Sequence, residues 1–267
     1  MKNDEITFLI IAQNEEKRIA RAVQSCIQIG KVLVIDGGST DATVTIAKEL
    51  GAEVIQNTFK YAAQQYNFGL EQIQTKWAFI LDADERVGLE LGSSIRAVDS
   101  NSPFVAFWTD RINYFAGKPI HHSGWSPDRN VRLLNVSQSR YDDRPVHARV
   151  IADGELGKLK GPIHHFTYST ITQYVTKLNR FTSREVEARV QTQKVLDSRS
   201  RWRAIYLRMP AKGVVRFIYM YILRVGFLDG RTGFDLARMS ANYETVVALK
   251  QRYDAHQAAD DEPANYV

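Results

Sequence analysis

The run V-L-V-I-D-G-G-S-T-D-A-T (Val32–Thr43) combines an apolar strand, a tight turn and the start of a helix. Val32–Ile35 contains only apolar residues, which is typical of a strand that is buried on both faces of a sheet. The two glycines that follow Asp36 allow a tight turn. Ser39–Asp41 contains residue types that begin helices, and Gly51 is a typical helix stop. This stretch therefore predicts one strand–turn–helix unit of an α/β fold.

Three other apolar runs alternate with helical segments over the first hundred residues. Residues 7–12 and 77–81 are continuous apolar strands, and residues 53–55 form a weaker one. Apolar side chains recur at helical spacing between residues 19 and 27, and residues 61–74 also have a helical pattern. We therefore expect an α/β fold in which a mostly parallel sheet is covered by helices on both faces.

Polar residues follow three of these strands at the point where each strand ends. They are Gln-Asn-Glu at 13–15, Asp-Gly-Gly-Ser-Thr-Asp at 36–41 and Asp-Ala-Asp-Glu at 82–85. Asn14 and the acids that follow it are expected to cap the first helix and to occupy its first turn. Ligands of parallel sheets bind at the carboxyl ends of the strands, so the three acidic clusters are expected to converge in space.

The acidic clusters favour a nucleotide bound through its ribose and a metal ion. The chain contains neither G-x-x-x-x-G-K-[ST] nor G-x-G-x-x-G, so the usual phosphate-binding loops are excluded. Asp36 suits hydrogen bonds to ribose hydroxyls or to a base N–H, and Asp82-x-Asp84 suits Mg²⁺ or Mn²⁺ together with phosphate oxygens. The alternative is that Asp36 and Asp41 stabilise a turn and a helix start, and that the D-x-D spacing is fortuitous.

Composition limits the class of protein further. The 267 residues carry a net charge of +5 and are 44% hydrophobic, which excludes a disordered chain. One cysteine, Cys26, excludes a disulfide framework and a cysteine-based zinc site. No signal peptide or membrane-spanning run is evident, so we expect a cytoplasmic protein.

Several motifs occur in an order that resembles family 2 glycosyltransferases of the GT-A fold, which is Rossmann-like. These motifs are F-L-I-I-A-Q-N-E-E (Phe8–Glu16), V-L-V-I-D-G-G-S-T-D-A-T (Val32–Thr43), N-F-G (Asn67–Gly69) and F-I-L-D-A-D-E-R (Phe79–Arg86). Others resemble the branch that contains lipopolysaccharide core β-glucosyltransferases acting on heptose: H-S-G-W-S-P-D-R-N-V-R-L (His122–Leu133), R-P-V-H (Arg144–His147), L-K-G-P-I-H-H (Leu159–His165) and R-V-G-F-L-D-G-R-T-G (Arg224–Gly233). The resemblance covers residues 5–250.

The resemblance implies inverting transfer of a sugar from UDP or a similar nucleoside diphosphate. Asn14 and Glu15 would line the nucleotide pocket, Asp36 would contact uracil or ribose, and Asp82 would contact the nucleotide or the sugar. The full set of nucleotide-sugar-binding residues that it implies is Ala12, Asn14, Glu15, Asp36, Gly38, Gln65, Asn67, Asp82 and Ala83. Asp84 would ligate Mg²⁺ or Mn²⁺. The chain departs from the branch at Ala148, where its members usually carry Glu after the histidine of the V-H motif.

An inverting transfer needs a base that faces the sugar from the side opposite the leaving diphosphate. Asp128 is our first choice because it lies in a loop rich in His, Gly, Trp and Pro. It could instead pair only with a neighbouring arginine. Asp142, Asp143 and Glu85 remain alternative bases.

The same part of the chain contains residues suited to the acceptor and to the metal. Trp125 could support a sugar ring or could simply pack its loop. His165, or its neighbour His164, could complete the metal shell or contact the diphosphate, although a histidine pair is often structural. The expected acceptor-binding residues are Glu85, Trp125, Arg129, Arg132 and His147. The two arginines could neutralise a diphosphate or an anionic acceptor, or could be merely solvated.

The C-terminal part is basic and aromatic. Eight basic residues and one acid, Asp229, occur between Arg199 and Arg231, and Val214–Leu228 is mostly apolar but too short to span a bilayer. This pattern favours a helix lying on an anionic membrane, which suits a lipid-anchored glycan acceptor. The alternative is a helix that packs on the catalytic domain with arginine stems covering apolar surface. Nucleic acid is disfavoured as a partner because no RNA-binding motif accompanies the charge.

These observations predict three segments: a GT-A catalytic domain over residues 1–195, a helical extension over 196–254 and a flexible tail over 255–267. Within the first, residues 1–103 form the nucleotide-sugar half and 104–195 the acceptor half. The leading hypothesis is a glycosyltransferase of the lipopolysaccharide core, peripherally bound to the inner face of the cytoplasmic membrane. Alternatives are a transferase acting on a protein or another glycolipid, a sugar-nucleotide pyrophosphorylase, and a membrane-surface module without turnover.

Overall fold

The computed structural model describes residues 4–144, 148–168, 170–193 and 212–253, and it divides the chain into two compact units. The first unit contains residues 1–113 and 127–167, and the second contains residues 114–126 and 168–267. The sequence placed residues 114–126 and 168–195 in the catalytic domain, whereas in the structure they group with the C-terminal helices. The reason is a shared apolar core, described below, that periodicity along the chain does not reveal.

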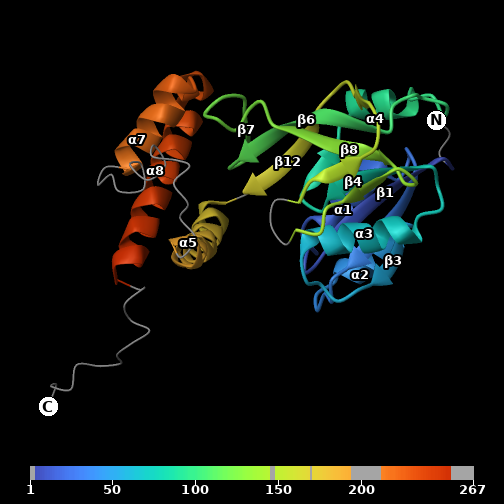
Figure 1. Cartoon of the computed structure of the whole chain (residues 1–267), viewed down its shortest axis with the longest axis horizontal. Coiled ribbons are helices and arrows are strands. Elements are labelled where there is room, and N and C mark those ends of the chain that lie inside the picture. The colour runs from blue at the N-terminus through green and yellow to red at the C-terminus, as the bar shows by residue number, and fades with distance from the viewer. Residues whose placement is uncertain (1–3, 145–147, 169, 194–211, 254–267) are drawn as a thin grey trace, which may run out of the picture. The chain divides into compact units, whose positions relative to one another are not determined.

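The first unit is built on one large sheet (Figure 1). Its strands follow the order β3 (Glu53–Gln56), β2 (Lys31–Asp36), β1 (Ile6–Ala12), β4 (Trp77–Asp82), β8 (Arg129–Asn135), β6 (Ala106–Phe115), β12 (Ile163–Tyr168) and β5 (Glu85–Val87). β3, β2, β1 and β4 are parallel, as predicted, whereas β8 runs antiparallel to both β4 and β6. The short strands β7 (Lys118–Ile120) and β11 (Leu156–Lys158) pair with β6, and β9 (Ser139–Tyr141) pairs with β10 (Val150–Ala152). The parallel part of the sheet therefore lies within residues 1–103, where the sequence predicted a parallel sheet.

Helices cover both faces of this sheet, as expected. α1 (Ile19–Cys26), α2 (Thr43–Glu49) and α4 (Leu89–Arg96) pack on one face, and α3 (Ala62–Gln72) packs on the other. Successive side chains of β1 point to opposite faces, so Phe8 and Ile10 join the first core and Leu9 joins the second. All three are fully buried, and each such side chain stabilises the fold by about 1.5–3 kcal/mol.

The first helix begins later than predicted. α1 starts at Ile19 and has no acidic residue in its first turn. Asn14 adopts a left-handed backbone conformation with φ of 56°, and the Glu15 carbonyl accepts the N–H groups of Arg18 and Ile19 at 2.8 Å. The turn over residues 15–18 thus separates the acids of the motif from the helix and leaves them at the end of β1.

The second unit has its own core. Its elements are α5 (Ile171–Gln193), α7 (Lys212–Ile218), the π-helical turn η1 (Tyr219–Leu223), the 3₁₀ turn η2 (Gly226–Asp229) and α8 (Gly230–Tyr253), together with β7. The buried apolar residues are Phe115, Ile120, Tyr174, Met220, Leu236 and Ala237. α7 and α8 pack against each other as an antiparallel hairpin. The contacts show the direction: Gly213 lies against Ala241, and Phe217, further along α7, lies against the earlier residue Phe234 of α8. None of the helices among the described residues is long and apolar enough to cross a membrane.

Asp229 joins the loop over residues 121–126 to the turn between the two helices of this hairpin. Its carboxylate accepts the N–H groups of His121 and His122, each at 3.0 Å, and the hydroxyl of Ser123 at 3.2 Å. Trp125 packs in the same unit against Phe115, with ring centroids 6.2 Å apart. Two motifs that are distant in sequence are therefore parts of one local structure.

Candidate active site

The carboxyl end of β2 is shaped by Asp36, which is fully buried. One carboxylate oxygen accepts the N–H groups of Gly38 at 3.1 Å and Ser39 at 3.0 Å, and the other accepts the Ser39 hydroxyl. Gly38 has φ of +92°, and a Cβ on Gly37 would lie 2.9 Å from the Cβ of Phe59. Both positions therefore require glycine, which is what the sequence suggested for this turn.

The loops that follow β1 and β2 are hydrogen-bonded to each other. Asn14 Oδ1 accepts the Thr40 N–H at 2.8 Å, and the N–H of Asn14 bonds to the Ser39 hydroxyl at 2.9 Å. The N–H of Glu15 bonds to the Thr43 hydroxyl at 2.8 Å. The structure thus brings Asn14, Glu15 and Asp36 together at one edge of the sheet.

The other expected nucleotide-binding residues have structural partners. Ala12 and Ala83 are buried at strand ends, and the Ala12 carbonyl accepts the Gly37 N–H. Gln65 bonds through its amide to the carbonyl of Asn57, at 2.9 Å. Asn67 bonds to both backbone groups of Tyr141, at 2.8 and 3.0 Å. These two amides position neighbouring segments.

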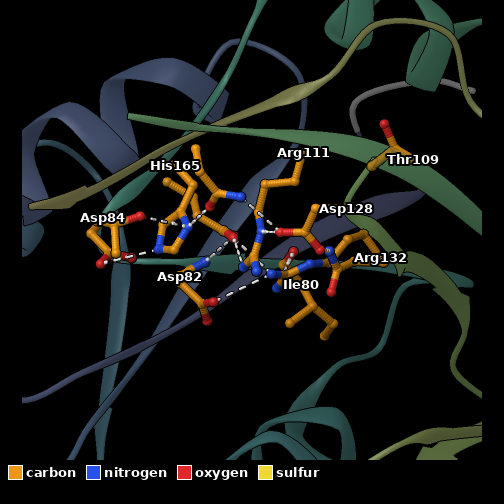
Figure 2. Close-up of polar contacts among 12 residues, drawn as sticks. Ile80, Asp82, Asp84, Thr109, Arg111, Asp128, Arg132 and His165 are labelled. Atoms are coloured by element: carbon orange, nitrogen blue, oxygen red, sulfur yellow. Dashed lines mark hydrogen bonds and ion pairs between the residues drawn. The ribbon is translucent and has the colours of Figure 1, made fainter. Parts of the chain in front are cut away.

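A set of polar and charged side chains, which we call the strand-end network, lies around the carboxyl end of β4, on β5, β6, β8 and β12 and just before β8 (Figure 2). Its members are Asp82, Asp84, Glu85, Arg111, Asn113, Asp128, Arg132 and His165. Glu85 is at its centre and is fully buried. Its Oε1 accepts from Arg132 at 2.7 Å and from Arg111 at 3.0 Å, and its Oε2 accepts the Asp82 N–H at 3.0 Å. The sequence suggested that Glu85 binds the acceptor, but its carboxylate is instead bonded to other groups within the protein.

Arg132 is buried as well, although a solvated side chain was one expectation for it. It contacts Asp82 at 3.3 Å in addition to Glu85. Burial opposes its charge, but the two carboxylates hold the pKa of Arg132 well above its ordinary value. For Glu85, burial raises the pKa above its ordinary value, although the positive charges of Arg132 and Arg111 act to lower it. Arg132 therefore fixes the end of β4 from within the sheet.

Asp128 accepts hydrogen bonds on both carboxylate oxygens. Oδ2 accepts from Arg111 Nε at 2.8 Å and from Asn113 Nδ2 at 3.0 Å, and Oδ1 accepts from Asn130 at 2.9 Å. Partial burial works against the charged form, but the bond from Asn113 and the charge of Arg111 lower the pKa of Asp128 below its ordinary value. The side chain keeps 24% of its surface exposed, so an ionised carboxylate is accessible to a ligand.

Asp84 and His165 form the opposite end of the network. β12 pairs with β5 in a register that sets His165 across from Glu85, and His165 Nε2 lies 3.5 Å from Asp84 Oδ2. His165 Nδ1 lies 2.6 Å from Asn113 Oδ1. His164, the other candidate, pairs in register with Arg86, so its side chain points to the opposite face of β12 from that of His165.

One hydrogen-bond chain sets the tautomer of His165. The Asp128 carboxylate only accepts, so Asn113 must direct its NH₂ group to Asp128 and its oxygen to His165. Nδ1 of His165 therefore donates to Asn113, and Nε2 is the ring nitrogen that faces Asp84. This arrangement is typical of a metal-binding histidine, whose second nitrogen is held by a hydrogen bond.

The residues present fit a divalent cation that is shared with a ligand. Adjacent ligands at about 2.1 Å from an octahedral ion are about 3 Å apart, close to the separation of Asp84 and His165. No group of three or more His, Cys, Asp or Glu side chains in the described part of the chain could hold a metal by itself. Further ligands would have to come from water or from a bound diphosphate.

Several expected site residues lie elsewhere. Arg129 is exposed and pairs with Asp110, which alternates along β6 with the network residues and so faces the other way. Asp142 bonds to Arg144, and Asp143 to Tyr61. Trp125 belongs to the second unit, where it packs its loop, and His147 lies outside the described residues.

Arg111 and Asn113 were missed by the sequence analysis. The signal was present as polar residues at every second position of β6, at Thr109, Arg111 and Asn113, which places all three on one face.

The chain is similar in sequence to known proteins over most of its length. The model of the family described as "Glycosyl transferase family 2" matches residues 7–152, and the chain belongs to this family. The lipopolysaccharide core biosynthesis glycosyltransferase LpsC of Rhizobium meliloti (strain 1021) is 26% identical over 92% of this chain and 91% of its own length. An uncharacterized glycosyltransferase of Rickettsia felis is 28% identical over 86% of this chain and 83% of its own.

A solved structure supports the fold. The crystal structure of S. aureus TarS 1-349 in complex with UDP aligns with a TM-score of 0.50 and 13% sequence identity, over 98% of this chain and 94% of that chain. The fold is therefore the GT-A glycosyltransferase fold that the motifs implied, with a mixed sheet and a helical C-terminal portion.

Proposed function

We propose that this protein is a metal-dependent inverting glycosyltransferase that moves a sugar from a UDP-sugar to a lipid-anchored glycan, with the lipopolysaccharide core as acceptor. The observation that carries the proposal is the strand-end network, in which Asp84 and His165 face each other and Asn113 connects them to Asp128. Family membership supports sugar transfer. LpsC supports the choice of acceptor, and the UDP bound to TarS supports the choice of nucleotide.

The donor half of the site is assigned to the carboxyl ends of β1, β2 and β4. Asp84 and His165 would hold Mn²⁺ or Mg²⁺, and the metal would offset the charge of the diphosphate as it leaves. The imidazole ligand favours Mn²⁺, because Mg²⁺ prefers oxygen ligands. Asp36 was expected to contact the nucleoside directly, but its buried carboxylate would instead hold the Gly38–Ser39 turn in place beside the nucleoside. Asp82, partly exposed, would contact the nucleotide or the sugar.

Asp128 is the proposed base. It would accept the proton of the acceptor hydroxyl as that oxygen forms the new bond to the anomeric carbon and the bond from this carbon to the diphosphate breaks. Arg111 and Asn113 keep its carboxylate ionised and oriented. Oδ2 already accepts two hydrogen bonds, from Arg111 and Asn113, whereas Oδ1 accepts one, from Asn130, and has a further lone pair for the hydroxyl.

Asn113 would position both ends of the site at once. Its amide oxygen fixes the ring of His165 and its amide nitrogen fixes the carboxylate of Asp128. A single side chain thereby relates the proposed metal ligand to the proposed base. Such indirect partners commonly contribute 10–100-fold in metal affinity or activity, to order of magnitude.

The proposed acceptor, a lipopolysaccharide core glycan, rests on the similarity to LpsC and on the charged residues near the site. The acceptor-binding roles of Arg129, Trp125 and His147 remain proposals, and Arg129 pairs with Asp110 on the side of β6 that faces away from the network. Ala148 replaces the usual glutamate and packs on the core around α3, so the carboxylate for proton transfer is Asp128 rather than one at 148. We place the reaction on the cytoplasmic face of the membrane, where a lipid-anchored acceptor and a nucleotide-sugar meet.

A screen of nucleotide-sugars tests this function. The full-length protein is incubated with each donor and Mn²⁺, and the released nucleoside diphosphate is measured without acceptor. We expect slow hydrolysis of one UDP-sugar that stops with EDTA. Formation of a nucleotide-sugar from a nucleoside triphosphate and a sugar phosphate would instead indicate a pyrophosphorylase, and absence of turnover with every donor would favour a binding module.

A further inference from the structure

The turn between α7 and α8 carries a run of apolar side chains on its surface. We call residues 219–231 the α7–α8 tip; it lies in the orange part of the ribbon in Figure 1. Leu223 is 70% exposed and Leu228 is 60% exposed, and Ile222 and Phe227 are also exposed. Isolated exposed apolar residues are common, but several within one short turn indicate a surface that meets another apolar phase.

The backbone of the tip is shaped to hold these side chains outward. η1 is a π-helical turn, η2 is a 3₁₀ turn, and between them Val225 adopts φ of +46°. A β-branched residue in this left-handed conformation is strained. A Cβ on Gly226 would lie 2.6 Å from the Met220 carbonyl oxygen and from the Ser123 hydroxyl oxygen, so the turn is tightly packed on the side that faces these residues. The exposure is therefore a fixed feature of this turn.

The charge around the tip is positive. Residues 212–235 contain the cations Lys212, Arg216, Arg224 and Arg231 and the anions Asp229 and Asp235. Lys212 is buried, so the positive charge at the surface comes from the three arginines. Asp229 is almost fully buried in its hydrogen bonds to residues 121–123, so it adds little negative charge to the surface. Arg231 is 92% exposed and lies 3.8 Å from the carboxylate of Asp235, an exposed ion pair that a lipid phosphate can replace. Apolar side chains with basic neighbours are the combination that binds anionic lipid surfaces.

We propose that the α7–α8 tip inserts into the headgroup region of an anionic lipid bilayer, with Leu223 and Leu228 as the penetrating side chains and Arg231 contacting lipid phosphate. The proposal deepens the proposed function and rests on it for the idea of a lipid-anchored acceptor. A second copy of the chain is the weaker alternative occupant, since two basic tips would repel each other.

Co-sedimentation of the full chain with vesicles tests this proposal. Vesicles of phosphatidylcholine alone are compared with vesicles that contain phosphatidylglycerol. We expect binding to the anionic vesicles that weakens with salt, and at least a tenfold loss in Leu223→Asp/Leu228→Asp. The matched control is Leu89→Asp, a leucine that is 94% exposed on α4 and should bind vesicles as the wild type does.

A charge variant of Arg231 and a measurement of UDP binding separate a loss of membrane binding from a loss of folding or of the donor site. Arg231→Glu replaces an exposed positive charge with a negative one beside Asp235 and should also weaken binding to anionic vesicles. UDP binding by calorimetry should be the same in wild type and in the tip variants, so a failure at the membrane is separate from a failure of the donor site. Vesicle binding that is unchanged in both tip variants, or a dimer that the double variant disrupts, would overturn the proposal.

Discussion

The strand-end network and the α7–α8 tip depart from ordinary burial in opposite directions. In the network, Glu85 and Arg132 are buried charges, each held by opposite charges and hydrogen bonds. At the tip, Leu223 and Leu228 are apolar side chains left in solvent. The first arrangement fixes the direction of polar groups, and the second presents a surface of low polarity.

The contrast indicates that the two regions are suited to two different kinds of partner. A buried ion pair contributes little net stability, because desolvation of both charges opposes their attraction. An exposed leucine forgoes the stabilisation of burial. Neither feature is explained by stability of the isolated chain, so we assign the network to a charged ligand and the tip to an apolar one.

The largest effect is expected for Asp84→Ala. Loss of the carboxylate beside His165 removes a proposed metal ligand, and donor turnover should fall by about 10⁴-fold. Turnover is measured as released nucleoside diphosphate, and thermal unfolding checks that the variant folds. Unchanged turnover would exclude Asp84 as a ligand.

Asp128→Asn should lower transfer by about 10³-fold, since an amide cannot accept the proton of the hydroxyl. UDP binding should remain within twofold of the wild type, because the base contacts the acceptor. Asp110→Asn is the matched control: Asp110 lies on β6 and faces away from the network. Similar losses in both variants would argue against a base at 128.

The contrast in burial can be tested through stability. Glu85→Ala leaves Arg111 and Arg132 without their shared carboxylate and should lower the free energy of unfolding by about 3–5 kcal/mol. Leu228→Asp should change it by less than about 0.5 kcal/mol, because its side chain is already exposed. Urea unfolding measures the change in free energy of unfolding for both variants. Equal changes in the two variants would contradict the difference in burial between the strand-end network and the α7–α8 tip.

Asn113→Ala should weaken Mn²⁺ activation by about 10–100-fold, since His165 loses the bond that fixes its ring. The same loss in His165→Ala, with no further loss in the double variant, would show that Asn113 acts through His165. Fully additive losses would mean that it acts elsewhere.

Arg111→Gln should shift the acid limb of the kcat/KM profile to higher pH. The pKa of Asp128 is lowered in the wild type, against the effect of partial burial, by Asn113 and Arg111, so its carboxylate stays ionised until the pH falls below the ordinary aspartate range. Without the guanidinium, protonation and loss of the base occur at higher pH. An acid limb that does not move would assign the titrating group to another residue.

The sequence was sufficient for the parts of the site that lie at strand ends. Apolar runs followed by polar residues marked β1, β2 and β4, and parallel strands bring their carboxyl ends to one edge. Asn14, Asp36, Asp82 and Asp84 were found in this way, because the signal lies within a few residues of each strand.

The sequence was insufficient where the pairing of distant strands decides the contact. Asn113 meets His165 and Asp128 only because β6, β8 and β12 come together, and no local pattern specifies that register. Burial of Arg132 depends on Glu85 from another strand. Trp125 was predicted as a candidate sugar platform, but its neighbours in space, Phe115 and Tyr168, are set by the second core.

Calorimetry of UDP binding tests the central claim most directly. The full-length wild type and Asp84→Ala are titrated with UDP in Mn²⁺ and again in EDTA. The strand-end network predicts that Mn²⁺ tightens UDP binding at least tenfold in the wild type and has no effect in the variant. Equal UDP affinity with and without Mn²⁺ in the wild type would contradict the assignment of a metal and a nucleoside diphosphate to this network.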